Sequence, residues 1–227
     1  MSVKNQFSFN AKNYENYSFI QKKVAENLIN KTTSKPGSIL DLGCGTGSLY
    51  NSINWPVDDF YAVDFSKEML QIHARNKGVK CIVGDFNDSM LFDKLRQYKI
   101  NRIFSSSSLQ WAKNLDATFK HIKNLDAPIS FAIFTANTFK TVFETAKIPP
   151  LLRTTEEVTS LANKYFNAHY ETINYKLSFI STLDMFRYIK KSGVSGARNI
   201  LDYKNMKDLI KNYPIDYLEF EVLFITE

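Results

Sequence analysis

The chain has 227 residues, of which 44% are hydrophobic and 14% aromatic, and its formal net charge is +6. This composition supports one domain with its own core. It contains no run of about 18 apolar residues that could span a membrane, and residues 1–13 lack the apolar centre of a secretion signal. Cys44 and Cys81 are isolated thiols without metal-ligand spacing. We therefore expect a cytoplasmic, monomeric protein with reduced cysteines and no metal.

The positive charge is spread along the chain rather than gathered in one basic arm, which argues against a nucleic-acid-binding protein. The denser groups of basic residues are Lys22-Lys23, Lys190-Lys191 with Arg198, and Lys204, Lys207 and Lys211. Two interpretations stay open. These groups are either solvated faces of a Lys-rich chain or a surface that meets an acidic protein partner near the mouth of the site.

Hydrophobic periodicity and turn residues divide the chain into alternating strands and helices. The expected helices are 14–30, 46–52, 66–76, 90–97, 115–124, 183–191 and 205–212, and the expected strands are 39–42, 60–64, 79–84, 100–104, 129–135, 171–180 and 218–226. This alternation predicts an α/β fold in which helices cover both faces of a parallel sheet. Pro149-Pro150 interrupt it, and we expect residues 138–167 to form a helical insertion.

The most informative motif is the apolar run Ser38-Ile39-Leu40, which ends in Asp41 and continues into Gly43-x-Gly45-x-Gly47. Closely spaced glycines allow positive φ angles and close approach of a ligand to the backbone. A strand that feeds such a turn places a nucleotide-type pocket at its carboxyl end. The spacing differs from the G-x-G-x-x-G of dinucleotide binding. Asp41 would repel a pyrophosphate, but it could accept hydrogen bonds from the cationic end of an amino acid.

Two further strands also end in acidic residues. Asp64 closes the run 60–63, 21 residues after Gly43, and Asp85 follows the run 81–83. Because the carboxyl ends of parallel strands meet at one edge, Asp64 is placed where it can bind both hydroxyls of a ribose. Ser66 could simply be a helix N-cap and Met69 a core residue, and neither role excludes a cofactor contact.

The glycine motif, together with the D-x-S-x-x-M-L pattern of residues 64–70, resembles class I S-adenosylmethionine-dependent methyltransferases. The resemblance implies a Rossmann-like, seven-stranded, mostly parallel sheet whose last strand is antiparallel. It implies that Phe65 and Met69 pack on the adenine, that Asp85 accepts its amino group and that Ser106 faces the sulfonium. The implied cofactor-binding residues are Asp41, Gly43, Gly45, Gly47, Asp64, Phe65, Met69, Asp85, Phe86 and Ser106.

A narrower resemblance points to one branch of this family. The segment 13–17 with Gln21, the Gln110-Trp111 pair and the Ile189-Lys190-x-x-Gly193 turn resemble malonyl-acyl-carrier-protein O-methyltransferases of biotin synthesis. This implies methylation of the free carboxylate of a malonyl thioester, giving the ester that primes pimeloyl synthesis. The acyl-carrier protein would meet Lys190, Lys191 and Arg198. Trans-aconitate methyltransferases share the Gln-Trp segment, so a small-acid carboxyl methyltransferase stays open.

Methylation of a carboxylate needs no general base, because a group with a pKa of about 4 is already ionised at neutral pH. In agreement, His73, His121 and His169 lie outside the cofactor motifs. Catalysis would then depend on positioning and on exclusion of water. We expect residues 1–30 and 138–167 to act as lids over the cofactor. The catalytic candidates are Tyr14, Gln110, Trp111 and Arg187, with Arg198 as a further cation.

Two other functional classes make different demands on the sequence. A methyltransferase-like module without activity would be expected to have lost the acidic residues, whereas Asp41, Asp64 and Asp85 are present. A nucleic-acid methyltransferase would carry an N/D-P-P-Y/F motif after the fourth strand, where this chain has four serines, 105–108. The sequence therefore favours a small-molecule or acyl-group methyltransferase.

Overall fold

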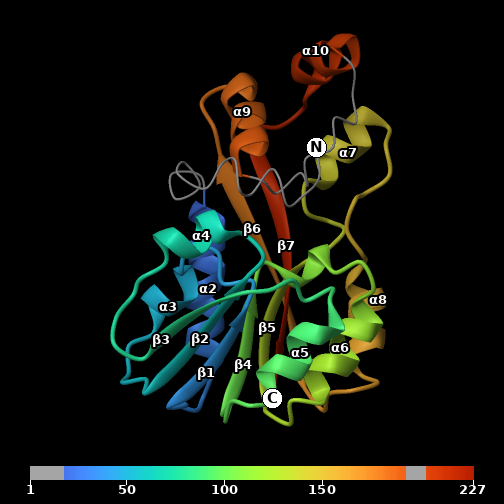
Figure 1. Ribbon diagram of the computed structural model, residues 1–227. Coiled ribbons are helices and arrows are strands. Elements are labelled where there is room, and N and C mark those ends of the chain that lie inside the picture. Colours follow the sequence, from blue (N-terminus) through green and yellow to red (C-terminus); the bar gives the residue numbers. More distant parts are fainter. Residues whose placement is uncertain (1–17, 193–202) are drawn as a thin grey trace.

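The computed structural model describes residues 18–192 and 203–227, and these form an α/β fold around one seven-stranded sheet (Figure 1). The strands are β1 (Ser38–Leu42), β2 (Asp59–Asp64), β3 (Val79–Val83), β4 (Arg102–Ser106), β5 (Ile129–Phe134), β6 (His169–Ser178) and β7 (Tyr217–Thr226). Their spatial order is β3-β2-β1-β4-β5-β7-β6. Pairing is parallel from β3 to β5, and β7 runs antiparallel to both of its neighbours. The expected mostly parallel sheet with an antiparallel last strand is confirmed.

Helices cover both faces of this sheet. The helices are α2 (Phe19–Lys31), α3 (Ser48–Ser52), α4 (Lys67–Ile72), α5 (Ser89–Leu95), α6 (Leu115–Lys123), α7 (Lys140–Ala146), α8 (Thr155–Ala162), α9 (Thr182–Ser192) and α10 (Tyr203–Asn212), with a 3-10 turn η1 (Leu109–Trp111). Figure 1 shows α2, α3 and α4 on one side and α5, α6 and α8 on the other.

The core consists of two apolar clusters, one on each face of the sheet. Ile39 packs with α2 in the first cluster, whereas the next residue, Leu40, packs with α5 and α6 in the second. Successive side chains of a strand point to opposite faces, so a strand covered on both sides is apolar throughout. This is why the continuous apolar run before Asp41 forms a central strand with its tip at the site.

Most expected boundaries agree with the observed ones within two residues, and two of the shifts have identifiable reasons. The strand expected at 100–104 is Arg102–Ser106, because Asn101 instead closes the end of the sheet, exchanging hydrogen bonds of 2.9 and 3.0 Å with Ser38. The helix expected at 66–76 ends at Ile72, because His73 has a ψ of 141°, outside the helical range, and its ring packs against Tyr50 and Phe60.

The expectation that residues 138–167 lie over the cofactor is corrected for α8. Val158, Ala162 and Phe166 are buried at a spacing of four residues. The first two lie on α8 and Phe166 follows it, and together they form one apolar stripe. This stripe packs against α6 and the sheet, and Phe166 meets the rings of Phe119 and Phe131 edge-on. The helix α8 therefore belongs to the layer that covers the sheet, while α7 packs beside β7 and α10.

At the top of Figure 1, α9 and α10 lie beyond the ends of β6 and β7. Several expectations fall outside the described residues, namely those for Tyr14, Arg198, the first part of the N-terminal helix and the turn at 193–196. Within the described ranges, no helix combines the length and apolar character needed to cross a bilayer.

Candidate active site

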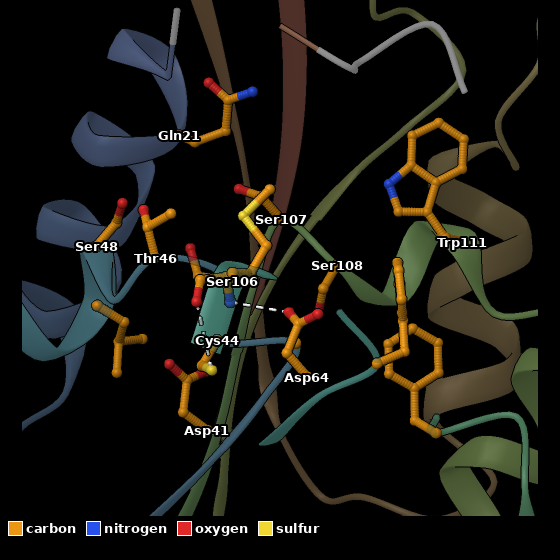
Figure 2. A pocket seen from close by; sticks show the side chains of 16 residues that line it. Gln21, Asp41, Cys44, Thr46, Ser48, Asp64, Ser106, Ser107, Ser108 and Trp111 are labelled. Carbon is orange, nitrogen blue, oxygen red and sulfur yellow. Dashed lines mark hydrogen bonds between the residues drawn. The ribbon is translucent and has the colours of Figure 1, made fainter. Parts of the chain in front are cut away.

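A pocket lies at the carboxyl ends of β1, β2 and β4 (Figure 2). Its lining includes eight of the ten residues that the sequence predicted for the cofactor: Asp41, Gly43, Gly45, Asp64, Phe65, Met69, Phe86 and Ser106. The topology brings these residues together because the three strands are neighbours in the sheet and run in the same direction.

The floor of the pocket is the glycine turn after β1. Gly43 has a φ of +79°, and a Cβ atom there would lie 2.4 Å from the Cβ of Ser108. The backbone N–H groups of Gly43 and Cys44 both donate to the carbonyl of Val63, at 2.8 and 3.0 Å. Only glycine allows this turn to fit between the tips of β2 and β4.

Asp64 fixes the glycine turn to the tip of β2. Its carboxylate accepts a hydrogen bond from the Gly45 N–H at 2.9 Å and another from the Ser66 N–H at 2.8 Å. Burial raises the pKa of Asp64, and the backbone donors oppose that rise. Each carboxylate oxygen has a second lone pair, so the group can hold the loop and also accept from the hydroxyls of a ligand.

Asp41 is the least satisfied charged group in the pocket. It is 1% exposed, and neither carboxylate oxygen has a hydrogen-bond partner among the described residues. Burial, and secondly the charge of Asp64, raise its pKa to about 8. Buried polar groups are normally hydrogen-bonded. Two unpaired oxygens that line a pocket therefore fit a donor supplied by a ligand.

The serine run after β4 has two separate roles. The hydroxyls of Ser105 and Ser108 lie 2.6 Å apart, and each lies 2.8 Å from the carbonyl oxygen of Leu42, so they join the tips of β4 and β1. Those of Ser106 and Ser107 line the pocket and have no partner among the described residues. Ser107 has a φ of +59°, and strained residues of this kind are concentrated at functional sites.

Gln21 is a pocket residue that was quoted in the sequence motif but not predicted as part of the site. It reaches into the pocket from α2 (Figure 2), is 6% exposed, and its Oε1 has no partner among the described residues. The available signal in the sequence was the Y-x-x-x-Q pattern of residues 17–21.

Of the predicted catalytic residues that the structure describes, one lines the pocket and two do not. Trp111 lines the pocket, and Figure 2 shows its indole nitrogen directed inward. Gln110 is not among the lining residues; its Nε2 donates to the carbonyl of Ser107 at 2.8 Å, so its amide stabilises the turn. Its Oε1 is buried without a partner among the described residues, so a contact between Gln110 and substrate stays a prediction.

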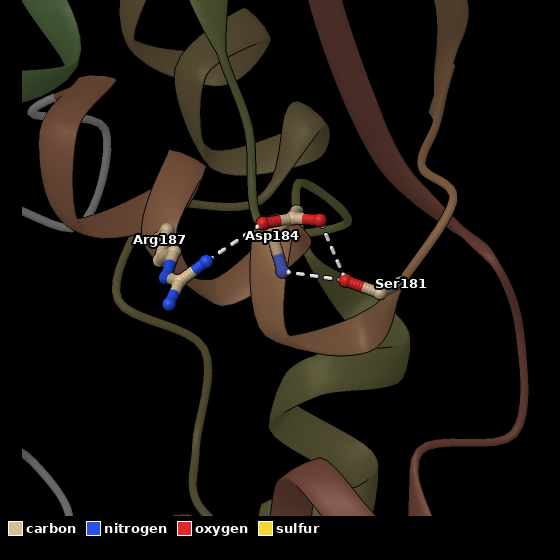
Figure 3. Close-up of polar contacts among 3 residues, drawn as sticks. All are labelled: Ser181, Asp184 and Arg187. Atoms are coloured by element: carbon tan, nitrogen blue, oxygen red, sulfur yellow. Dashed lines mark hydrogen bonds and ion pairs between the residues drawn. The ribbon is translucent and has the colours of Figure 1, made fainter.

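Arg187 is not among the residues that line the pocket, and its catalytic role stays a prediction. Its guanidinium donates to Asp184 at 3.0 Å, and Asp184 accepts in turn from Ser181 (Figure 3). The Arg187 side chain is 61% exposed, whereas Met185 and Tyr188 form the buried face of α9. The amphipathic helix therefore turns Arg187 to solvent as part of an i,i+3 pair.

Two of the predicted cofactor residues do not line the pocket. Gly47 is the N-cap of α3 with a φ of +96°, and a Cβ atom there would lie 3.0 Å from the ring of His73. Asp85 accepts hydrogen bonds from the backbone and side chain of Asn87, and its charge contributes to the raised pKa of Asp64. Both residues lie at the edge of the site, and their cofactor roles stay predictions.

The lining residues in the described part of the chain include no histidine, lysine or arginine. Cys44 lines the pocket as a free thiol, and burial, followed by the charge of Asp41, raises its pKa. Within the described ranges no cluster of three or more His, Cys, Asp or Glu residues could hold a metal. The site therefore offers acidic acceptors, hydroxyls and aromatic surface.

The fold and this site define a class I methyltransferase, and the sequence comparison agrees. A family described as a methyltransferase domain matches residues 33–179, so the chain belongs to that family. In particular, the chain is similar to malonyl-[acyl-carrier protein] O-methyltransferases. The enzyme of Calditerrivibrio nitroreducens is 26% identical over 88% of this chain and 82% of its own length. The second such enzyme of Ilyobacter polytropus is 27% identical over 86% and 81%.

Solved structures show the same fold. The YcgJ protein of Bacillus subtilis superposes with a TM-score of 0.62 at 11% identity, covering 90% of this chain and 98% of that one. A phosphoethanolamine N-methyltransferase of Haemonchus contortus, solved with S-adenosylhomocysteine, gives a TM-score of 0.57 at 14% identity, covering 100% of this chain and 60% of that one. At these identities the likeness concerns the fold alone.

Proposed function

We propose that this methyltransferase uses S-adenosylmethionine to methylate the free carboxylate of a malonyl group carried on an acyl-carrier protein. The observation that carries the cofactor assignment is the pair Asp41 and Asp64 at adjoining strand tips. The Asp41 carboxyl is buried with no donor in the described part of the chain, and the Asp64 carboxyl is held in place by backbone N–H groups. The acceptor assignment is supported by the names of the relatives.

The residues of the pocket suit each part of this cofactor. Asp41 would accept hydrogen bonds from its ammonium group, which would supply the missing donors and the missing positive charge. Asp64 would accept from the ribose hydroxyls while keeping its bonds to Gly45 and Ser66. Phe65, Met69 and Phe86 supply apolar surface for adenine. When bound, the cofactor supplies an electrophilic methyl group on a sulfonium.

The described side chains on the acceptor side are neutral. The hydroxyls of Ser106 and Ser107 have no partner within the described ranges, and Trp111 presents an indole N–H. Neutral donors can orient a carboxylate and leave most of the negative charge on the attacking oxygen. Exclusion of water then strengthens the attraction between that oxygen and the sulfonium. An alcohol acceptor would need a base. The lining residues of the described pocket include no histidine or lysine, and this proposal assigns both lining aspartates, Asp41 and Asp64, to the cofactor.

An acyl-carrier protein is an acidic partner, and the proposed contact is the basic group Lys190, Lys191 and Arg198. Lys190 is exposed on α9, beyond the ends of β6 and β7, while the side chains of the other two lie outside the described part of the chain. Methylation would hide the terminal carboxylate of the acyl group. A product of this kind fits pimeloyl synthesis for biotin in the cytoplasm.

The test compares acceptors under identical conditions. Transfer of labelled methyl from S-adenosylmethionine would be measured with malonyl-carrier protein, free malonate and trans-aconitate. Acetyl-carrier protein is the matched control, because it keeps the carrier and lacks the free carboxylate. We expect turnover with malonyl-carrier protein and none with the acetyl form. Equal or faster turnover of a free acid would reject the carrier and favour a small-acid carboxyl methyltransferase.

A further inference from the structure

Trp111 forms one wall of the pocket from a short element that has little internal support. The 3-10 turn η1 spans only Leu109–Trp111, and it is closed by single backbone bonds such as Trp111 N–H to the Ser108 carbonyl at 3.1 Å. A helix end leaves carbonyl groups without intrahelical partners. The orientation of the indole therefore depends on whatever donor binds the carbonyls around it.

That donor is the guanidinium of Arg153, a residue 42 positions further along the chain. Its Nη2 donates to the carbonyl of Ala112 at 2.7 Å and reaches that of Lys113 at 3.4 Å, and its Nη1 reaches that of Gln110 at 3.4 Å. These carbonyls precede and follow Trp111. Arginine presents several donors in a rigid planar fork, which suits it to bracketing a turn in this way.

Arg153 is itself anchored to the sheet. Its carbonyl accepts from the Ala136 N–H at 2.9 Å, just beyond the end of β5. Two residues later, the Thr155 hydroxyl donates to the Glu221 carboxylate of β7 at 3.2 Å. Although burial opposes ionisation of Glu221, donors including Thr135 and Asn137 hold its pKa below the usual range. The segment that carries Arg153 is therefore tied to both β5 and β7.

We propose that Arg153 is a positioning residue that sets the orientation of Trp111 on the acceptor side of the pocket. The same turn also supports Ser107, whose hydroxyl lines the pocket. Gln110 lies within the turn, and its side chain donates to the Ser107 carbonyl at 2.8 Å. Loss of the guanidinium would release the wall that meets the acceptor and leave Asp41 and Asp64 in place. The consequence for turnover rests on the proposed function.

The decisive variant is Arg153→Met, which keeps the length of the apolar stem and removes every donor. Tryptophan emission would be recorded in a Trp55→Phe background, where Trp111 is the remaining tryptophan. We expect Arg153→Met to shift this emission, to lower kcat/KM for the acceptor by about tenfold, and to change the Kd of S-adenosylhomocysteine by less than about twofold. Arg153→Lys keeps one donor and is expected to restore part of both losses.

The matched control is Lys164→Met. Lys164 pairs with Asp116 at 3.0 Å, just beyond the C-terminal end of α8, and it joins α8 to α6 without touching the pocket wall. This variant should leave the emission, the cofactor affinity and kcat/KM unchanged. If the control shifts Trp111 emission as much as Arg153→Met does, the effect is a general loosening of α8 and the proposal is rejected.

A double-variant cycle tests whether Arg153 acts through Trp111. In a Trp111→Phe background, Arg153→Met should lower kcat/KM by less than about twofold further, because interacting residues are not additive. The proposal is overturned if the losses of kcat/KM in the two single variants multiply in the double variant. It is also overturned if tryptophan emission is unchanged in folded Arg153→Met and Arg153→Lys. Emission and S-adenosylhomocysteine binding need no acceptor. Failure of malonyl-carrier protein to react would therefore reject the proposed substrate and leave the test of Arg153 intact.

Discussion

Asp41 and Asp64 end neighbouring parallel strands, yet they have opposite hydrogen-bonding environments. Asp64 accepts from two backbone N–H groups, while both oxygens of Asp41 are unpartnered among the described residues. Burial and the charge of Asp64 raise the pKa of Asp41 to about 8. The site thus holds one carboxylate ready for hydroxyls and one carboxyl whose ionisation requires a positive ligand group.

The raised pKa of Asp41 should appear in the pH dependence of stability. The folded state keeps this proton up to a pH of about 8, whereas an unfolded aspartate loses it near pH 3.9. The folded state therefore binds more protons between these values, and the free energy of unfolding falls as pH rises through the window. Asp41→Asn should flatten this slope in urea unfolding between about pH 5 and about pH 8. The control Asp93→Asn, at an exposed position on α5, should keep the slope, and an unchanged slope in Asp41→Asn would contradict the assignment.

The same proton should be coupled to ligand binding. A cationic ammonium group favours ionised Asp41, so S-adenosylhomocysteine should bind with release of a proton at neutral pH. Calorimetry in two buffers of different ionisation enthalpy measures that release directly. The affinity for S-adenosylhomocysteine should also rise with pH up to about 8. Asp41→Asn should bind more weakly and release no such proton; proton release that persists in this variant would place the coupled group elsewhere.

Asp64→Ala should weaken S-adenosylhomocysteine binding by about 1–3 kcal/mol, because two ribose hydroxyls lose a charged acceptor. The glycine turn would also lose its bond from Gly45 to β2. Asp85→Asn is the comparison, because Asp85 lies outside the pocket lining and accepts from Asn87. We expect a smaller loss there. Equal losses in the two variants would show that Asp85 contacts the ligand as strongly as Asp64 does.

The glycine turn predicts a contrast between two similar substitutions. Gly43→Ala places a Cβ 2.4 Å from Ser108, whereas Gly45→Ala places it with nothing within 4 Å. Both positions have positive φ, so each variant meets backbone strain, but only the first meets a clash. We expect Gly43→Ala to destabilise by about 2–3 kcal/mol and Gly45→Ala by about 1 kcal/mol. Chemical unfolding measures both, and similar values would contradict the close approach at Gly43.

Arg187→Ala should leave kcat and KM unchanged. Arg187 pairs with Asp184 on the exposed face of α9, and surface ion pairs contribute little to stability. Trp111→Phe is the comparison from the pocket wall and should lower kcat/KM for the acceptor. A marked loss of turnover in Arg187→Ala would restore Arg187 as a residue that meets the acceptor.

Local signals were sufficient for the strands and for much of the cofactor pocket. The apolar run before Asp41, the glycine turn and the acidic ends at Asp64 and Asp85 are short segments, and their conformation follows from neighbouring residues. Parallel pairing then brings their ends together. Strand order is therefore enough to place eight of the predicted cofactor residues in one pocket.

The remaining assignments depended on contacts between distant parts of the chain. Gln110 and Trp111 are adjacent in sequence, yet only Trp111 lines the pocket, because the turn that carries them is bracketed by Arg153. The apolar stripe of α8 packs against α6 and the sheet and does not lie over the pocket. The sequence by itself therefore determined the sheet and its acidic tips. Only the tertiary structure decided which side chains form the acceptor wall, because their orientation depends on long-range packing and hydrogen bonds that no local pattern encodes.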